Sequence, residues 1–267
     1  MIREKIKSLV LENGAAEAEI IKISAIDTSL FCERLSCYPA ELDYLRRGER
    51  QRANPQLWFP GARSALLAIF PYWQKGISHC EKQSEIKDPY AFLENTGRKP
   101  PAFLKGKRFS IARYALCTDY HITVRHAMEK ALSIARNLFA DLKWKIFVDS
   151  SPVLEKELAA KAGLAFPGKN TLAINEKIGS YFCIGGAMLN LDCGIEPIEV
   201  KSLCQNCQRC INACPTGALS EYKLEPLKCL SYWTTHNKKN TPPLELLDLC
   251  EKTFGCDICQ EACPYNK

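Results

Sequence analysis

Eight cysteines towards the end of the chain have the spacing that holds iron–sulfur clusters. The first four follow the run C-x2-C-x2-C-x3-C-P, and the last three follow C-x2-C-x3-C-P after one separate cysteine. They are Cys204, Cys207, Cys210, Cys214, Cys229, Cys256, Cys259 and Cys263. Such a run lets one turning loop place three thiolates on three corners of a cubane. The sequence therefore predicts two [4Fe–4S] clusters and the transfer of single electrons.

The cysteine before the proline decides how the two clusters share their ligands. In two-cluster ferredoxins this cysteine ligates the other cluster. The spacing therefore predicts crossed ligation, in which each run gives its last cysteine to the other cluster. Cluster one would take Cys204, Cys207, Cys210 and Cys263. Cluster two would take Cys229, Cys256, Cys259 and Cys214.

Zinc and disulfides are the alternatives for these cysteines. Zinc ribbons also use paired C-x2-C units, but not the longer run that ends in C-P. Disulfides need an oxidising compartment. The start of the chain, Met1 to Val10, is amphipathic and lacks the apolar core of a signal peptide. The spacing favours iron–sulfur clusters over both.

Asp149 is the strongest candidate for chemistry outside the cysteines. It comes where a predicted strand ends and a helix is expected to begin, a common place for active residues in α/β folds. The alternative is that Asp149 only caps the next turn. Local sequence leaves both interpretations open.

Two other short motifs are incomplete. Gly168-Lys169-Asn170-Thr171 resembles the end of a phosphate-binding loop, but Asn170 stands where that motif needs Ser or Thr. A loop with a lysine and an amide could still hold a cofactor's phosphate or amides. Asp119-Tyr120-His121 begins the D-x-H-x-x-G motif of corrinoid proteins, but Val124 replaces the glycine. The residues alone therefore do not support a histidine-ligated corrinoid.

The net charge is +6, and basic residues gather in two stretches, 46–52 and 98–113. The second stretch has no acid, and its basic residues are Arg98, Lys99, Lys105, Lys107, Arg108 and Arg113. Clustered basic residues with nearby aromatic rings could bind a phosphate backbone. The alternative is a solvated loop, which Pro100-Pro101 and Gly106 favour. Charge alone leaves nucleic-acid binding open.

Hydrophobic periodicity and Gly/Pro punctuation predict the elements that must position these residues. The strongest helix is expected at 119–142. A strand at 145–148 would deliver Asp149, and Ser151-Pro152 predicts the N-cap of a helix that ends near Ala162. The remaining predictions are helices at 2–13 and 42–47, strands at 20–26, 65–70, 171–174 and 181–191 (the last loosened by Gly185-Gly186), and mostly loop at 74–108.

These elements predict two domains. Residues 1–200 are expected to form an α/β or α+β domain, and residues 201–267 a ferredoxin-like module. The longest apolar run, Ala65 to Phe70, has strand length and is far below the roughly 18 residues of a membrane span. We therefore expect a soluble, cytoplasmic protein without membrane contact.

Short stretches along nearly the whole chain resemble, in the same order, the epoxyqueuosine reductases, cobalamin and iron–sulfur enzymes of tRNA queuosine synthesis. The resemblance includes both cysteine runs. The other matching stretches are Pro60-Gly61-Ala62-Arg63-Ser64, Ala112-Arg113-Tyr114-Ala115-Leu116, Asp119-Tyr120-His121, Val148-Asp149-Ser150, Pro152-Val153-Leu154-Glu155, Ala162-Gly163-Leu164, Gly168-Lys169-Asn170-Thr171-Leu172, Lys228-Cys229-Leu230-Ser231-Tyr232 and Gly255-Cys256-Asp257-Ile258-Cys259-Gln260.

The resemblance implies a cobalamin-binding α/β domain joined to a two-cluster ferredoxin-like domain, an arrangement shared in outline with reductive dehalogenases. Electrons from a reduced donor such as flavodoxin or ferredoxin would pass through the clusters to a corrinoid held without a histidine ligand. The reduced cobalt would remove the epoxide oxygen of epoxyqueuosine in tRNA, and Asp149 would be the general acid. A carboxyl acid at neutral pH needs a pKa raised by burial, which a corrinoid closing the pocket would provide. Cobalamin contacts are implied for Arg113, Tyr120, Asp149, Lys156, Lys169 and Asn170.

Two alternatives to this function stay open. Longer members of the family continue after the second cluster into a helical-repeat domain that can contact RNA. This chain ends at Lys267, and a short form without that domain is expected. A related corrinoid iron–sulfur reductase could therefore act on another substrate. An electron carrier that feeds a partner would need neither Asp149 nor a corrinoid cavity.

Overall fold

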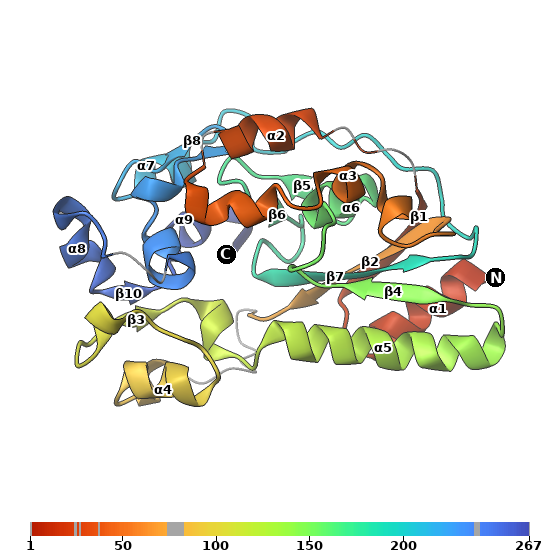
Figure 1. Cartoon of the computed structure of the whole chain (residues 1–267), viewed down its shortest axis with the longest axis horizontal. Coiled ribbons are helices and arrows are strands. Elements are labelled where there is room, and N and C mark those ends of the chain that lie inside the picture. The colour runs from red at the N-terminus through yellow and green to blue at the C-terminus, as the bar shows by residue number, and fades with distance from the viewer. Residues whose placement is uncertain are drawn as a thin grey trace.

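The computed structural model describes residues 2–23, 26, 28–36, 38–73, 83–237 and 241–266. Its centre is a four-stranded sheet in the order β1-β2-β7-β4, with every neighbouring pair antiparallel. The strands are β1 (Glu17–Lys22), β2 (Ser64–Pro71), β7 (Phe182–Leu189) and β4 (Trp144–Phe147). Strand β2 is buried from Ser64 to Phe70 because helices cover both faces of the sheet (Figure 1).

One face of the sheet is covered by α1 (Ile2–Glu12) and α5 (Tyr120–Leu138), which lie side by side (Figure 1). The apolar residues of α5 recur at three- and four-residue steps, so one stripe of the helix faces the sheet. Its buried residues are Val124, Met128, Ala131, Leu132 and Ala135. The predicted helical periodicity is therefore confirmed, and Leu142 is also buried although the helix ends at Leu138.

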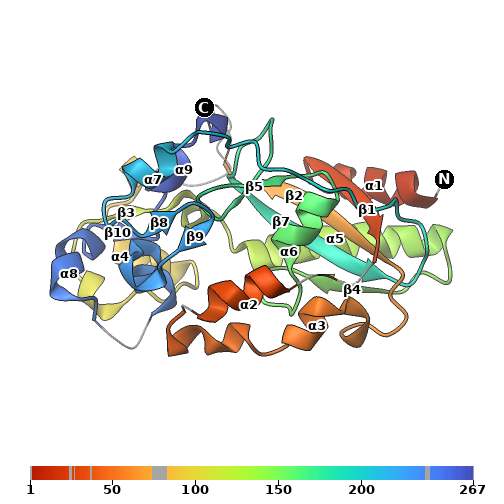
Figure 2. The same ribbon diagram turned by 90° about the horizontal axis from the view of Figure 1, so that it is seen from above.

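The opposite face is covered by α6 (Glu155–Lys161), with α2 (Ser29–Ser36) and α3 (Glu49–Ala53) on the same side (Figures 1 and 2). Leu154 and Leu158 pack in the same buried cluster as Leu67 and Phe147 of the sheet. The chain therefore forms three layers, helix–sheet–helix. The predicted α/β (α+β) class is confirmed, with an antiparallel sheet.

The C-terminal part is built from very short elements. These are α7 (Arg209–Ala213), β8 (Leu219–Ser220), β9 (Lys223–Leu224), α8 (Leu244–Cys250), β10 (Thr253–Phe254) and α9 (Ile258–Glu261). Helices α7 and α9 pack together. Strand β10 pairs in parallel with β3 (Ser110–Ile111), next to α4 (Pro89–Asn95) in Figure 1. The remaining pairs, both antiparallel, are β8 with β9, and β5 (Phe166–Pro167) with β6 (Ala173–Ile174). The 3-10 turns are Ala40–Leu45, Pro55–Leu57, Gln83–Glu85, Ala102–Leu104, Arg113–Leu116, Pro226–Lys228 and Pro264–Asn266, and a π-helix spans Tyr232–His236.

Helix α6 begins later than the Ser151-Pro152 signal predicts. The guanidinium of Arg52 donates to the carbonyl of Val153 at 3.1 Å and to that of Ser151 at 3.4 Å. These carbonyls are therefore held by a side chain of α3, and the helix starts at Glu155 after Leu154. The predicted N-cap at Ser151 is wrong.

Other boundaries also differ from the prediction. Residues 83–108, expected as loop, contain α4, where Asp88 caps the helix and Pro89 takes its first position; residues 74–82 lie outside the described part. The helix expected at 42–47 is a 3-10 turn at Ala40–Leu45, and the strand expected at 171–174 shortens to Ala173–Ile174 because Thr171 has a φ of 67°. Strand β1 ends at Lys22, and residues 24 and 25 of the predicted strand are not described.

Gly185 and Gly186 do not loosen β7, contrary to the prediction. The strand pairs without interruption with β2. A Cβ atom on Gly186 would stand 2.1 Å from Cζ of Phe147, and one on Gly185 would stand 2.4 Å from Cγ1 of Val124. Gly186 therefore leaves room for the Phe147 ring of the neighbouring strand β4, and Gly185 leaves room for Val124 of α5. Across the described residues, no helix is both long and apolar enough to cross a membrane.

Candidate functional site

Asp149 lies on a strained turn at the end of β4. Its φ is 53°, a left-handed conformation that is uncommon for residues other than glycine. The backbone N–H of Ser150 donates to the carbonyl of Val148 at 2.6 Å, which closes a three-residue turn around Asp149. The side chain of Asp149 is 61% exposed. Strain of this kind gathers at functional sites, because only the surrounding structure can maintain it.

The start of α5 surrounds the Asp149 carboxylate with proton carriers. Tyr120 Oη donates to Asp149 Oδ2 at 2.7 Å, and His121 Nε2 lies 3.3 Å from the same oxygen. The other ring nitrogen of His121, Nδ1, lies 2.8 Å from Asp119 Oδ1. Asp119 is also the N-cap of α5 and accepts the backbone N–H of His121 at 2.9 Å. The result is a continuous row Asp119–His121–Asp149–Tyr120, which can hold or move a proton.

Burial raises the pKa of several groups close to Asp149 above values that already leave them uncharged at neutral pH. Burial and then the charge of Asp149 raise the pKa of the Tyr120 hydroxyl, so Tyr120 stays a donor. The same causes, in the same order, raise the pKa of the Cys183 thiol. Burial raises the pKa of Tyr114 to about 12. Asp149 is thus an acidic group with neutral neighbours on several sides.

Glu155, the first residue of α6, is a site residue that sequence reasoning did not single out. Burial, followed by the charge of Asp149, raises its pKa to about 8, and it accepts the backbone N–H of Asp149. Its Oε1 atom is buried and has no hydrogen-bond partner among the described residues. Glu155 is therefore a second carboxyl beside Asp149, and its burial favours the protonated form. Only the displaced start of α6 brings the two together, and no local signal predicts it.

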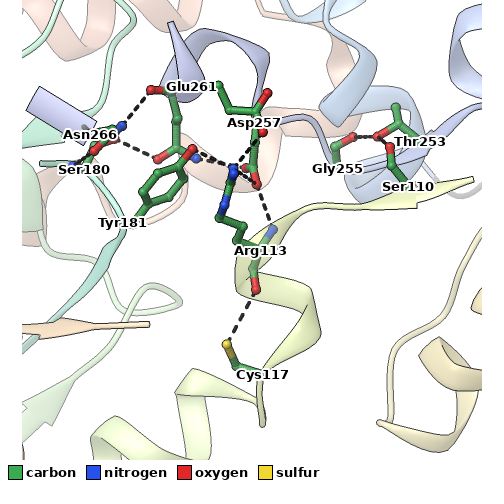
Figure 3. A network of polar contacts seen from close by, with 11 residues as sticks. Ser110, Arg113, Cys117, Ser180, Tyr181, Thr253, Gly255, Asp257, Glu261 and Asn266 are labelled. Atoms are coloured by element: carbon green, nitrogen blue, oxygen red, sulfur yellow. Dashed lines mark hydrogen bonds and ion pairs between the residues drawn. The ribbon is translucent and has the colours of Figure 1, made fainter. Parts of the chain in front are cut away.

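Arg113 joins the two parts of the chain. Its Nη1 donates to Tyr181 Oη and to Glu261 Oε1, both at 2.8 Å, and its backbone N–H donates to Asp257 Oδ2 at 2.8 Å (Figure 3). The guanidinium also lies over the rings of Trp73 and Tyr181, 4.7 and 4.8 Å from their centroids. Asp257 lies between two cluster cysteines, so Arg113 anchors the cluster region to the sheet domain.

The structure brings the four thiols of predicted cluster one together. They line one cavity of about 410 Å³, and these thiols are Cys204, Cys207, Cys210 and Cys263. The pKa of Cys210 is raised by burial and then by the neighbouring thiols. Burial first, and then Cys204 and Cys207, also raise the pKa of the Cys263 thiol, although Cys263 is about fifty residues beyond the first run. The crossed set is thus assembled by the packing of α7 against α9.

The thiols of predicted cluster two are also neighbours. Burial and then Cys229 raise the pKa of Cys256 to about 11, and Cys214 contributes to the same shift. Burial opposes the charged form of Cys214, but hydrogen bonds from Thr216, Ala218 and Leu219 outweigh it and lower its pKa. Among the described residues, no three possible ligands converge on one point as they would around a single ion. A cubane does not require this, because each thiolate ligates a different iron atom. The two sets therefore fit two clusters.

The six residues predicted to contact cobalamin lie at three places. Tyr120 and Asp149 are together at the start of α5, and Arg113 is at the junction described above. The other three lie on or against the loop 168–172: the Lys156 ammonium donates to the carbonyl of Thr171 at 2.9 Å, and Lys169 pairs with Glu221 at 2.6 Å. Lys169 and Asn170 line the cavity of the cluster-one thiols.

Comparisons with known families agree with this architecture. Residues 203–266 match the family model of the 4Fe-4S double cluster binding domain. Residues 52–150 match the model described as epoxyqueuosine reductase QueG, DUF1730. The fold and the thiols define a double-cluster iron–sulfur protein, and the predicted pair of clusters is confirmed at this level.

Known relatives give the family. An epoxyqueuosine reductase of Cyclobacterium marinum is 30% identical over 232 residues, 86% of this chain and 67% of that protein. One of Pseudomonas aeruginosa is 32% identical over 232 residues, 86% of this chain and 58% of that protein. The chain belongs to the epoxyqueuosine reductase family, and it spans 58% to 67% of the length of these relatives.

Solved structures share the fold. An epoxyqueuosine reductase from Streptococcus thermophilus superposes with a TM-score of 0.79 at 24% identity, covering 98% of this chain and 65% of that one. An epoxyqueuosine reductase solved with an epoxyqueuosine-modified tRNA-Tyr stem loop gives 0.73 at 21%, covering 98% and 64%. A reductive dehalogenase whose structure suggests a B12-dependent mechanism gives 0.55 at 16%, covering 98% and 31%.

Proposed function

We propose that this chain is a cobalamin-dependent iron–sulfur oxidoreductase that reduces epoxyqueuosine in tRNA to queuosine. The observation that carries the proposal is Asp149, held on a strained turn among neutral groups and linked to His121 and Tyr120. Family membership and the paired cluster sites support it. An electron carrier has no need of such a carboxyl, so the carrier alternative is disfavoured.

The reaction consumes two electrons and two protons. The epoxide loses its oxygen as water, both C–O bonds break, and a C=C bond remains. Two clusters that each carry one electron suit this demand. The thiols of the two predicted clusters are neighbours, because Cys210 of cluster one contributes to the raised pKa of Cys259 in cluster two. Cobalamin, when bound, supplies a strongly reducing centre for the epoxide carbon. A reduced donor such as flavodoxin or ferredoxin would supply the electrons.

The side chains around Asp149 would donate and replace the protons that the reaction consumes. Protonated Asp149 donates to the leaving oxygen, and His121, 3.3 Å from Asp149 Oδ2, returns a proton to the carboxylate. Asp119 orients the His121 ring through Nδ1, and Tyr120 fixes the carboxylate through Oδ2. Because both ring nitrogens of His121 face carboxylates, the site fits a corrinoid held without a histidine ligand. Tyr120 and Asp149 would contact it, with Arg113 and Lys156 as further predicted contacts.

The protein is proposed to act in the cytoplasm, away from any membrane. Substrate binding is proposed to use the basic stretch 98–113. The basic residues of this stretch have different roles in the structure. Arg98 donates to the carbonyls of Tyr114 and Cys117 at 3.3 and 2.8 Å and so supports the backbone, while Lys107 pairs with Glu251 at 3.0 Å. The exposed candidates for the phosphate backbone are Lys99, Lys105, Lys107 and Arg108.

The test is turnover of epoxyqueuosine-modified tRNA by anaerobically reconstituted protein with cobalamin. The wild type should form queuosine. Asp149→Asn keeps the size but removes the transferable proton, and general acid catalysis is typically worth about 10²–10⁴-fold. We expect a loss of that order with clusters and cobalamin still bound. Wild-type protein that binds cobalamin but leaves this tRNA unchanged would overturn the substrate, and full activity of Asp149→Asn would overturn the role of Asp149.

A further inference from the structure

The cavity of the cluster-one thiols contains a buried donor without a partner. Asn170 is 3% exposed and lines this cavity beside Cys204, Cys207, Cys210 and Cys263. Its Nδ2 atom is buried and has no hydrogen-bond partner among the described residues. A buried amide N–H without a partner is destabilising, because it has lost its bonds to water and gained none in return. An acceptor that belongs in the cavity would remove this cost.

The loop around Asn170 holds the amide in one orientation. Asn170 Oδ1 accepts the backbone N–H of Leu172 at 3.3 Å, so the carbonyl end of the amide is engaged and the NH₂ end remains. The turn is closed from both sides, since Thr171 N donates to the carbonyl of Gly168 at 2.9 Å and Gly168 N to that of Leu172 at 2.8 Å. A Cβ atom on Gly168 would stand 2.6 Å from Asn170 Oδ1. Glycine at 168 is therefore what leaves room for this amide.

We propose that the Asn170 side chain donates a hydrogen bond to a sulfur atom of cluster one and thereby raises its reduction potential. Sulfur atoms of a cluster are acceptors, and hydrogen bonds to them tune its potential. Reduction adds one negative charge to the cluster, so a donor stabilises the reduced form more than the oxidised form. The inference rests on the double-cluster domain and is independent of the reaction proposed above.

The neighbouring lysine does not provide the same effect. Lys169 Nζ is 2.6 Å from Glu221 Oε1, and this carboxylate raises the pKa of the ammonium. The positive charge is therefore largely balanced within the pair. The uncharged Asn170 amide is left as the donor that faces the cluster. Asn170, predicted from the sequence as a cobalamin contact, is in this proposal a cluster contact.

The test is the midpoint potential of each cluster in anaerobic holoprotein, measured by redox titration with electron paramagnetic resonance. The two signals are assigned with Cys214→Ala, which damages cluster two. Asn170→Leu removes the donor with little change of size. We expect the equilibrium constant for reducing cluster one to fall about tenfold, which is about 59 mV for one electron, and cluster two to stay unchanged. Asn206→Leu is the matched control, because Asn206 lines the same cavity but is exposed to water.

A second measurement covers the case in which Asn170→Leu fails to assemble cluster one. Pulsed resonance of reduced cluster one in wild-type protein with ¹⁵N-asparagine should show a nitrogen coupling that persists in Asn206→Leu. Asn170→His keeps a donor, so it should keep the potential within about twofold in the equilibrium constant and lose the ¹⁵N coupling. Absence of the coupling in the wild type, an unchanged potential in Asn170→Leu, or equal shifts of both clusters would overturn the proposal.

Discussion

The central sheet and the cluster segment, residues 203–266, are held together by different means. Strand β2 is buried along seven consecutive residues and pairs with a strand on each side. The cluster segment has strands of two residues and helices of four to seven residues. Helices this short are not stable by themselves. The sheet is thus stabilised by its own core, while the cluster segment is expected to depend on the clusters that its thiols are predicted to hold.

The largest expected effect comes from removing the clusters. Because metal-binding free energy is also folding free energy in small metal-bound units, iron chelation should unfold the cluster segment. Hydrogen exchange should accelerate by orders of magnitude in α7 and α9, while β2 and β7 keep their protection. Equal loss of protection in the sheet would show that the two parts are one cooperative unit and would remove the contrast.

A pair of core substitutions sharpens the same contrast. Leu66 is fully buried in β2, and Leu230 is buried in the cluster segment. In cluster-free protein, Leu66→Ala should lower the free energy of unfolding of the sheet domain by about 2–5 kcal/mol. Leu230→Ala should leave that free energy unchanged, because its surroundings are already unfolded. A loss of similar size in both variants would contradict the division.

Sequence patterns predicted the parts that depend on local information. The period of α5 and the apolar run of β2 are properties of consecutive residues. The start of α6 could not be predicted, because Arg52, about a hundred positions earlier, holds the carbonyls of Ser151 and Val153. The functional site divides in the same way into a part that local sequence predicts and a part that only packing determines. The cysteine spacing indicates both clusters, but only the packed structure places Asn170 beside Cys204, or Glu155 beside Asp149.

A smaller effect is expected from the buried carboxyl of Glu155. Its pKa is raised from 4.5 to about 8 in the folded protein. Between these values the folded state holds a proton that the unfolded chain has released, so stability falls as the pH rises and levels off above about 8. Glu155→Gln lacks this titration. Between pH 5 and 8.5 the Tm of anaerobic wild-type holoprotein should therefore fall about 2–8 °C more than that of Glu155→Gln.

The control for this comparison is Glu157→Gln, on the same first turn of α6. It should keep the wild-type dependence of Tm on pH. Identical pH profiles for wild type and Glu155→Gln would mean that Glu155 is charged in the folded protein.

The most direct test of the account is the iron content and cluster state of Cys214→Ala beside the wild type. Anaerobic wild-type protein should contain about eight iron and eight sulfide per chain, as two cubanes require. Cys214 is the last cysteine of the first run but lies with Cys229 and Cys256. Its replacement should therefore damage cluster two and leave the signal of cluster one intact. Loss of cluster one with cluster two preserved, or a wild type with about four iron or only zinc, would contradict the crossed assembly.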